Sequence, residues 1–173
     1  MNKRSVVWGL LLIACVVAWG LGAAANELGK NGNQLPTLEG TWRLVSRDLP
    51  DSTTQTPPAI VGLLTFHDGY RNFNIMWKDK ESAKTISISI ISTYRLTSSE
   101  YAENNVYYMM NNEIEGKGIK YDTSSKSGSS PVKVEDGQFS WRMPLFDEPM
   151  ITYKGDDLVA NGPGFVDHWQ RVK

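Results

Sequence analysis

The feature that most constrains this 173-residue chain is a pair of motifs at the two ends of its strand-forming part. Residues 40 to 46 read Gly-Thr-Trp-Arg-Leu-Val-Ser, and residues 168 to 173 read His-Trp-Gln-Arg-Val-Lys. A tryptophan in a first strand and an arginine in a last strand can together plug one end of a small β-barrel. We therefore expect Trp42 to fill the bottom of a barrel and Arg171 to lie within about 6 Å of its ring, in cation–π contact.

Alternation with a period of two, typical of β-strands, dominates the sequence after residue 37. It is clearest from residue 85 to 96, where isoleucines alternate with serines. The doubled Ile90-Ile91 predicts a bulge, after which Ile91 and Thr93 take over the inward face. The other candidate strand segments are residues 41–46, 60–66, 70–77, 100–110, 113–121, 132–135, 138–143, 150–154, 158–160 and 166–172.

Turn residues separate these strands and set the fold class. His67-Asp68-Gly69 predicts a hairpin between two short strands. Asp136-Gly137 marks another turn, and residues 51–58 and 124–131 are expected to form loops. The pattern predicts an all-β domain, a single antiparallel up-and-down barrel of about eight to ten strands. We favour a closed barrel over a sandwich because closure removes exposed edge strands.

The first twenty-five residues have the layout of a secretory signal peptide. Lys3 and Arg4 precede an uncharged, mainly apolar run, and Ala23-Ala24-Ala25 offers small residues at a cleavage junction. We therefore expect a signal peptide at residues 1–25 and an exported protein that begins at Asn26. Residues 26–37 are polar and glycine-rich, so they are expected to form a flexible linker before a barrel domain at residues 38–173.

Two other readings of the leader remain open. Leu12-Ile13-Ala14-Cys15 fits a bacterial lipobox, which would make Cys15 a lipid-anchored N-terminus. The apolar run is also just long enough to span a bilayer as an uncleaved anchor. All three readings export the rest of the chain, so we expect a periplasmic or secreted domain, and a membrane association only through Cys15 or an uncleaved leader.

Charge and cysteine content exclude several classes of function. The chain has 19 acidic and 18 basic residues, and two of the basic residues, Lys3 and Arg4, lie in the leader. Without the leader, the net charge is about −3. No basic cluster appears, so nucleic acid is not an expected partner. The one cysteine lies in the leader. The exported domain therefore has no disulfide, no catalytic thiol and no thiolate metal site.

The chain resembles the lipocalin-like branch of the calycin-type β-barrels of exported bacterial proteins. The resemblance rests on residues 38–46, on residues 62–66 with the turn that follows, and on Trp169-x-Arg171-Val172. It implies a barrel fold in which Gly40, Trp42 and Arg171 are structural closure residues without a catalytic role. Unlike typical lipocalins, the exported part has no cysteine and no evident C-terminal helix.

Candidate catalytic or metal-binding residues are few. His67 lies in a turn, and His168 follows Asp167 on the opposite strand face, so an acid from a neighbouring strand would have to orient it. Glu113 and Glu115 share a face of their expected strand. We expect these paired carboxylates to face the solvent. Two histidines a hundred residues apart form no metal motif. No metal site, phosphate-binding loop or cofactor motif is predicted, and the catalytic residues stay unknown.

Aromatic and methionine side chains indicate a ligand-binding cup. A barrel of this size is wide enough for one small ligand. Phe139, Trp141 and Met143 share one face, because Ser140 and Arg142 alternate with them. Tyr153 of the next expected strand should lie beside them. These four residues are the predicted ligand-binding residues.

Three functions compete on this sequence. The first is an exported lipocalin-like barrel that binds a small apolar molecule in its cup. The second is an isomerase, cyclase or hydratase that acts on such a molecule in the same cavity, so enzymatic activity stays an open question. The third is a filled barrel that serves as a protein-interaction module. A wholly apolar cavity would favour binding, a buried His168, Tyr153 or Glu113 with a partner would favour the enzyme, and a filled core would favour interaction.

Overall fold

The structure is a computed structural model that describes residues 37–79, 81–146 and 149–173. The predicted signal peptide at residues 1–25, with Cys15, and linker residues 26–36 lie outside the described residues. We describe the unit that contains the strands, from Asn33 to Lys173, by itself.

The described residues form β-strands and no helix, as the two-residue period predicts. The thirteen strands, in chain order, are β1 (Gly40–Asp48), β2 (Thr54–Gln55), β3 (Ile60–His67), β4 (Tyr70–Lys78), β5 (Thr85–Leu96), β6 (Glu100–Asn112), β7 (Gly118–Asp122), β8 (Ser127–Pro131), β9 (Lys133–Glu135), β10 (Gln138–Arg142), β11 (Met150–Lys154), β12 (Asp157–Gly162) and β13 (Phe165–Arg171).

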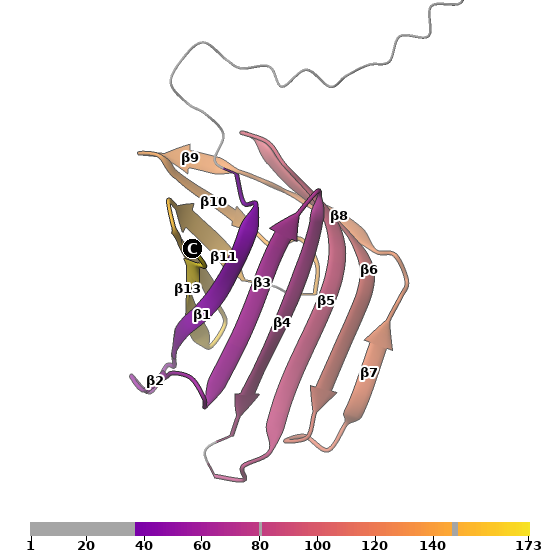
Figure 1. The fold of residues 1–173 in the computed structure, drawn as a ribbon. Helices are drawn as coiled ribbons and strands as arrows, with labels where there is room; N and C mark the ends of the chain where they lie inside the picture. Colours follow the sequence, from indigo (N-terminus) through magenta and orange to yellow (C-terminus); the bar gives the residue numbers. More distant parts are fainter. Residues whose placement is uncertain (1–36, 80, 147–148) are drawn as a thin grey trace, which may run out of the picture. The chain divides into compact units, whose positions relative to one another are not determined.

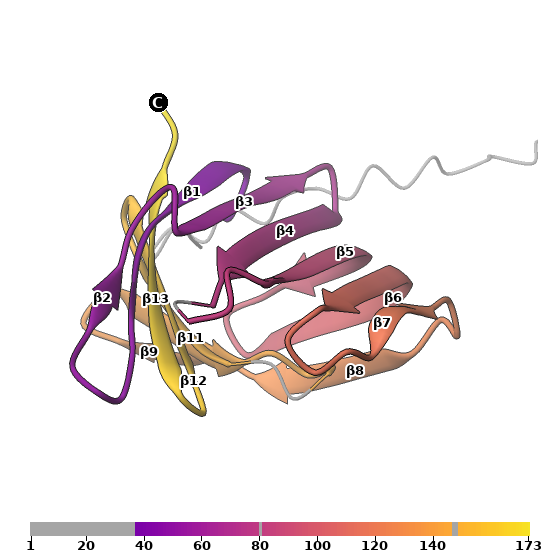
Figure 2. The same cartoon turned by 90° about the horizontal axis from the view of Figure 1, so that it is seen from below.

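All of these strands belong to one antiparallel sheet that curls strongly into a half-barrel (Figures 1 and 2). The order along the sheet is β7-β6-β5-β4-β3-β1-β13-β12-β11-β10-β9, with β2 beside β1 and β8 beside β6. The prediction of an antiparallel all-β fold is confirmed. The prediction of eight to ten strands is wrong, and the sheet is a half-barrel in which no ladder of the described residues joins its two ends.

Side chains fill the space between the two ends of the sheet. The Tyr108 ring stacks on Phe146 at 4.4 Å, and the Tyr101 ring stacks on Trp141 at 5.3 Å. A Cβ atom on Gly128 of β8 would lie 3.0 Å from the Cβ atom of Pro144. The two edges therefore meet through packed side chains rather than through a backbone ladder.

The Asp-Gly turns are confirmed as two-residue hairpin loops. His67 pairs with Tyr70, and Asp68 and Gly69 between them both have positive φ, at 48° and 74°. Asp136 and Gly137 repeat this geometry between β9 and β10, at 50° and 72°. Two positive φ values in the loop match the right-handed twist of the flanking strands, which is why Asp-Gly is favoured there.

Three segments differ from the sequence prediction. The strand expected at residues 113–121 covers Gly118–Asp122, because residues 113–116 form a turn. Glu113 and Glu115 therefore do not share a strand face. The expected loops at 51–58 and 124–131 contain β2 and β8. β8 reads Ser-Gly-Ser-Ser-Pro, a poor strand former, and it takes its conformation from backbone pairing with β6.

The predicted bulge lies on the neighbouring strand. The register of β5 with β6 shifts between Ile91 and Ser92, and Val106 of β6 is the extra residue. Ile91 is exposed, whereas Ser92 is buried. The inward face of β5 therefore runs through Ser92 instead of passing to Ile91 and Thr93, because β6 absorbs the change of phase.

Trp42 and Arg171 lie opposite each other on β1 and β13, and their predicted contact is confirmed. The guanidinium carbon lies 4.2 Å from the centroid of the buried Trp42 ring. The Trp42 indole N–H donates to the Leu38 carbonyl at 3.1 Å. Arg171 donates to the backbone carbonyls of Glu39 and Thr37, so the guanidinium also holds the segment that leads into β1.

Gly40 makes the close approach of Arg171 possible. Its φ is +119°, and a Cβ atom there would lie 2.9 Å from Arg171 Nη1. We expect Gly40→Ala to lower the free energy of unfolding by more than about 1 kcal/mol, measured by urea denaturation. Gly164→Ala is the matched control, because Gly164 has a φ of +112° with open space around it. An equal loss in both variants would mean that backbone strain alone acts at Gly40.

Candidate ligand-binding cavity

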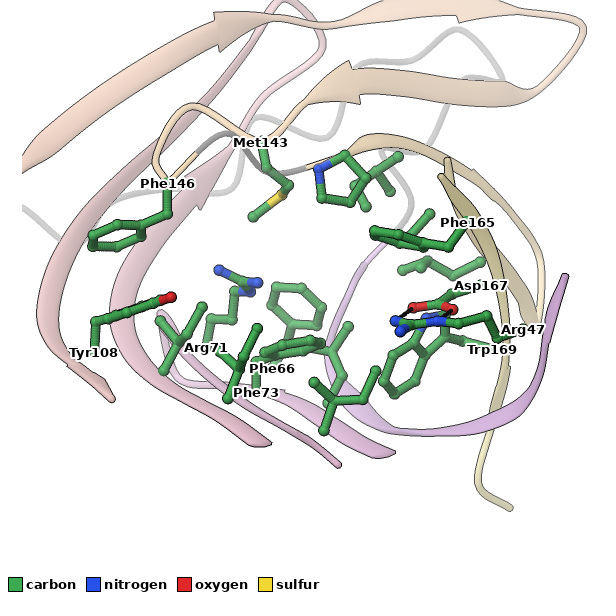
Figure 3. A pocket seen from close by; sticks show the side chains of 18 of the residues that line it. Arg47, Phe66, Arg71, Phe73, Tyr108, Met143, Phe146, Phe165, Asp167 and Trp169 are labelled. Carbon is green, nitrogen blue, oxygen red and sulfur yellow. Dashed lines mark hydrogen bonds and ion pairs between the residues drawn. The ribbon is translucent and has the colours of Figure 1, made fainter. Parts of the chain in front are cut away.

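The curled sheet surrounds a cavity of about 220 Å³ (Figure 3). Its wall is mainly apolar and comes from both halves of the sheet and from the segment between β10 and β11. The apolar residues of the wall are Leu64, Phe66, Phe73, Ile75, Trp77, Ile88, Ile90, Trp141, Met143, Phe146, Pro149, Ile151, Leu158, Ala160, Phe165 and Trp169. Arg47, Arg71, Tyr108 and Asp167 are the polar residues of the wall.

One buried ion pair, Arg71–Glu103, stands at the cavity wall. Arg71 of β4 donates from Nη1 to Glu103 Oε1 of β6 at 2.7 Å. The Ser92 hydroxyl donates to the same oxygen, and the Tyr101 hydroxyl donates to Oε2 at 3.4 Å. The Arg71 guanidinium lies 5.2 Å from the centroid of the Phe73 ring. Glu103 is thus held by three donors, as a carboxylate needs in order to stay buried.

A second buried ion pair joins β1 and β13. Arg47 donates from Nε and Nη2 to the two carboxylate oxygens of Asp167, at 2.6 and 2.7 Å. The guanidinium also lies between two rings, 4.7 Å from the Trp77 centroid and 4.3 Å from the Phe165 centroid. This bidentate pairing and the two ring contacts hold the guanidinium in place.

Two opposing effects act on the Asp167 carboxyl. Burial raises the pKa of Asp167 above its usual value, because the charged form loses water, and the hydrogen bonds and charge of Arg47 oppose that rise. The side chains of Arg47 and Asp167 are 7% and 4% exposed. The guanidinium binds both carboxylate oxygens, so the two opposite charges of this pair face each other directly.

The structure divides the four predicted ligand-binding residues into two groups. Phe139, Trp141, Met143 and Tyr153 are all buried, and the intervening Arg142 is exposed, so the predicted inward face is confirmed. Trp141 and Met143 line the cavity. Phe139 and Tyr153 instead face each other across β10 and β11 and pack at the Trp42 end, outside the cavity wall.

The Tyr153 hydroxyl is already engaged. It donates to the Thr37 carbonyl at 3.2 Å and accepts from Arg171 Nη2 at 3.1 Å. The hydroxyl therefore bonds within the protein at the Trp42 end, outside the cavity wall. Gly40, Trp42, Arg171 and Tyr153 belong to one structural cluster at that end of the half-barrel.

The charged residues of the cavity were missed at the sequence level. Arg71 shares the inward face of β4 with Phe73 and Ile75, so the alternation contained a signal for it. For Arg47, the alternation did not indicate an inward-facing side chain. The register of β1 with β13 shifts between Leu44 and Ser46, and this irregularity turns Arg47 inward.

The candidate catalytic residues lie elsewhere. His67 is highly exposed, with Nδ1 3.5 Å from Glu39. His168 does have an acid from a neighbouring strand, since its Nε2 lies 3.0 Å from Asp48 Oδ2, but the two side chains are 42% and 48% exposed and line no part of the cavity. Hydrogen bonds from Thr54 and His168 lower the pKa of Asp48.

Glu113 has a local structural contact. Its Oε2 accepts hydrogen bonds from the Thr85 hydroxyl and backbone N–H, at 2.6 and 2.9 Å. These bonds lower the pKa of the exposed Glu113 carboxyl. Glu113 therefore anchors the turn after β6 to the start of β5. It does not line the cavity.

The fold and the cavity together define the class: an all-β half-barrel with an internal cavity that holds two buried ion pairs. Comparisons of the chain with protein-family models, with curated proteins and with solved structures find no match. Within the described residues, no three His, Cys, Asp or Glu side chains are placed to hold a metal ion. That part of the chain also contains no helix long and apolar enough to cross a membrane.

Proposed function

We propose that this half-barrel binds a small, mainly apolar molecule in its cavity. The observation that carries the proposal is the cavity of about 220 Å³ with a wall of aromatic and aliphatic side chains. Apolar surface that leaves water for such a cavity contributes roughly 25 cal/mol per Å². A concave, mostly apolar site with a few placed polar groups is typical of small-molecule binding.

The size of the cavity limits the ligand. An apolar cavity of about 150 Å³ is enough to bind benzene. The cavity here is larger than that, at about 220 Å³, and smaller than the roughly 300–1,000 Å³ of sites for drug-sized molecules. We therefore propose a ligand with a chain of about eight carbon atoms, or a single substituted ring.

Binding is favoured over the two competing functions. Catalysis was expected to depend on a buried His168, Tyr153 or Glu113 with a partner. Tyr153 is buried and partnered, but its partners are Thr37 and Arg171 at the Trp42 end. None of the three residues lines the cavity. A barrel filled with side chains, as expected for a protein-interaction module, would leave no cavity. The resemblance to lipocalin-like barrels points in the same direction. We further propose that the domain acts in the periplasm or outside the cell, after removal of residues 1–25.

A cavity-filling variant tests the proposal. Ala160 of β12 lines the cavity, so Ala160→Leu should occupy part of the space and weaken binding of 2-octanone at least tenfold. The measurement is a titration of intrinsic fluorescence, because Trp77, Trp141 and Trp169 line the same cavity.

The matched control is Ala102→Leu. Ala102 of β6 is outside the cavity wall and pairs with Arg95 and Ser129, so the same three added carbon atoms should leave binding unchanged. Equal affinities in the wild type and both variants would place the ligand somewhere else. Copurification of a small apolar molecule with the protein from its own host, detected by native mass spectrometry, would identify the ligand itself.

A further inference from the structure

We infer that the cavity selects an uncharged molecule that carries a hydrogen-bond acceptor, and rejects the corresponding carboxylate. This inference rests on the proposed function, since it names the chemistry of the ligand in the same cavity. It follows from the charges of the wall and from the donors that the ion pairs leave available.

The charges at the cavity are balanced in pairs. Arg71 is 2.7 Å from Glu103, and Arg47 is 2.6 Å from Asp167. In each pair both side chains are less than a tenth exposed. A buried charge is tolerated when a partner of opposite sign and hydrogen bonds compensate for its lost hydration. Each arginine already has such a partner, so the described wall offers no uncompensated positive charge to an incoming anion.

A ligand carboxylate beside Arg71 would meet a like charge. Glu103 is held there by Arg71, Ser92 and Tyr101 together, so it is not readily displaced. The two carboxylates would lie within a few ångström of each other in an apolar environment, where like charges strongly oppose ionisation. The same argument applies beside Arg47, where Asp167 already accepts two hydrogen bonds.

A neutral acceptor does not meet this obstacle, and Arg47 has donors for it. A guanidinium carries five N–H donors, and the two bonds to Asp167 use one on Nε and one on Nη2. Among the described residues, no hydrogen bond is assigned to Nη1. The guanidinium contacts the rings of Trp77 and Phe165, and Figure 3 shows the Arg47 side chain extending into the cavity. A ketone, ester or ether oxygen can accept from Nη1 without adding charge.

Three probes of similar size test the inference on the purified protein at neutral pH: 2-octanone, octanoate and octane, each titrated by intrinsic tryptophan fluorescence. We expect 2-octanone to bind at least tenfold more tightly than octanoate. It should also bind roughly 2- to 10-fold more tightly than octane, which is the net value of one hydrogen bond. Octanoate that binds as well as 2-octanone, or octane that binds as well as the ketone, would overturn the inference while leaving the proposed cavity intact. Failure of all three probes to bind would overturn the proposed function and the inference with it.

Glu103→Gln tests the charge balance directly. The variant keeps the shape of the side chain but leaves Arg71 without its carboxylate, so the affinity for octanoate relative to 2-octanone should rise at least tenfold. Glu100→Gln is the control on the same strand, because Glu100 pairs with the exposed Arg95. An unchanged ratio in a folded Glu103→Gln protein would contradict the inference. If Glu103→Gln does not fold, the comparison of the three probes on the wild-type protein still tests the inference.

Discussion

Trp42→Ala is expected to lower the free energy of unfolding by about 3–5 kcal/mol, the cost of removing a large aromatic side chain from a core. The Trp42 side chain is fully buried. Its ring meets Tyr153 edge to face at 5.5 Å and Arg171 at 4.2 Å. Truncation would leave a void and would also remove the ring that the Arg171 guanidinium contacts. Chemical denaturation followed by circular dichroism measures the loss.

The control for this prediction is an aromatic residue on the outside of the sheet. Tyr121 of β7 is 63% exposed, so Tyr121→Ala should change the free energy of unfolding by no more than about 0.5 kcal/mol. A loss below about 1 kcal/mol for Trp42→Ala would mean that the Trp42–Arg171 cluster is not a structural centre of the half-barrel.

Asp167→Ala is expected to have a comparable effect, about 3–5 kcal/mol, because it leaves the buried Arg47 without its counter-charge. Glu100→Ala removes an ion pair of similar length, 2.7 Å to Arg95, but the two side chains are 63% and 39% exposed. It should cost at most about 1 kcal/mol, since water solvates both charges. Urea denaturation of both variants compares the two sites directly.

A double replacement separates the loss of the pair from the orphaned charge. Arg47→Met with Asp167→Leu exchanges both charges for apolar groups, so most of the stability lost in Asp167→Ala should return. Met also retains contact with the rings of Trp77 and Phe165. A double variant as unstable as Asp167→Ala would show that the bidentate geometry itself, rather than the unpaired charge, supports β1 and β13.

Local sequence patterns were sufficient to predict the strand conformation and the all-β fold class. Alternation determined the strand conformation, and the Asp68-Gly69 loop identified its hairpin because few residue pairs accept two positive φ values. The contact of Trp42 with Arg171 was also predictable, since one motif lies in the first strand and the other in the last. The inward face of Trp141 and Met143 followed from the exposed Arg142 between them.

Other features depend on long-range pairing, which the sequence does not display. β8 is a strand because β6 provides its hydrogen-bond partners, not because Ser-Gly-Ser-Ser-Pro favours one. The half-barrel has more strands than the pattern predicted for the same reason. Whether two edges of a sheet join by a ladder or by packed side chains depends on curvature summed over many strands.

What the sequence determined by itself is the class of the fold, its tight turns and the cluster around Trp42, because these depend on local propensity and on one specific pair of residues. The tertiary structure alone decided which charged residues pair at the cavity. Arg47 reaches Asp167 across 120 positions of the chain, and Arg71 reaches Glu103 across 32. Arg47 faces inward because of the irregularity in β1, and Glu103 because of the bulge in β6. A one-residue change of phase reverses which side chains face inward, so two small irregularities, one in β1 and one in β6, helped to place two charge pairs at the wall of an apolar cavity.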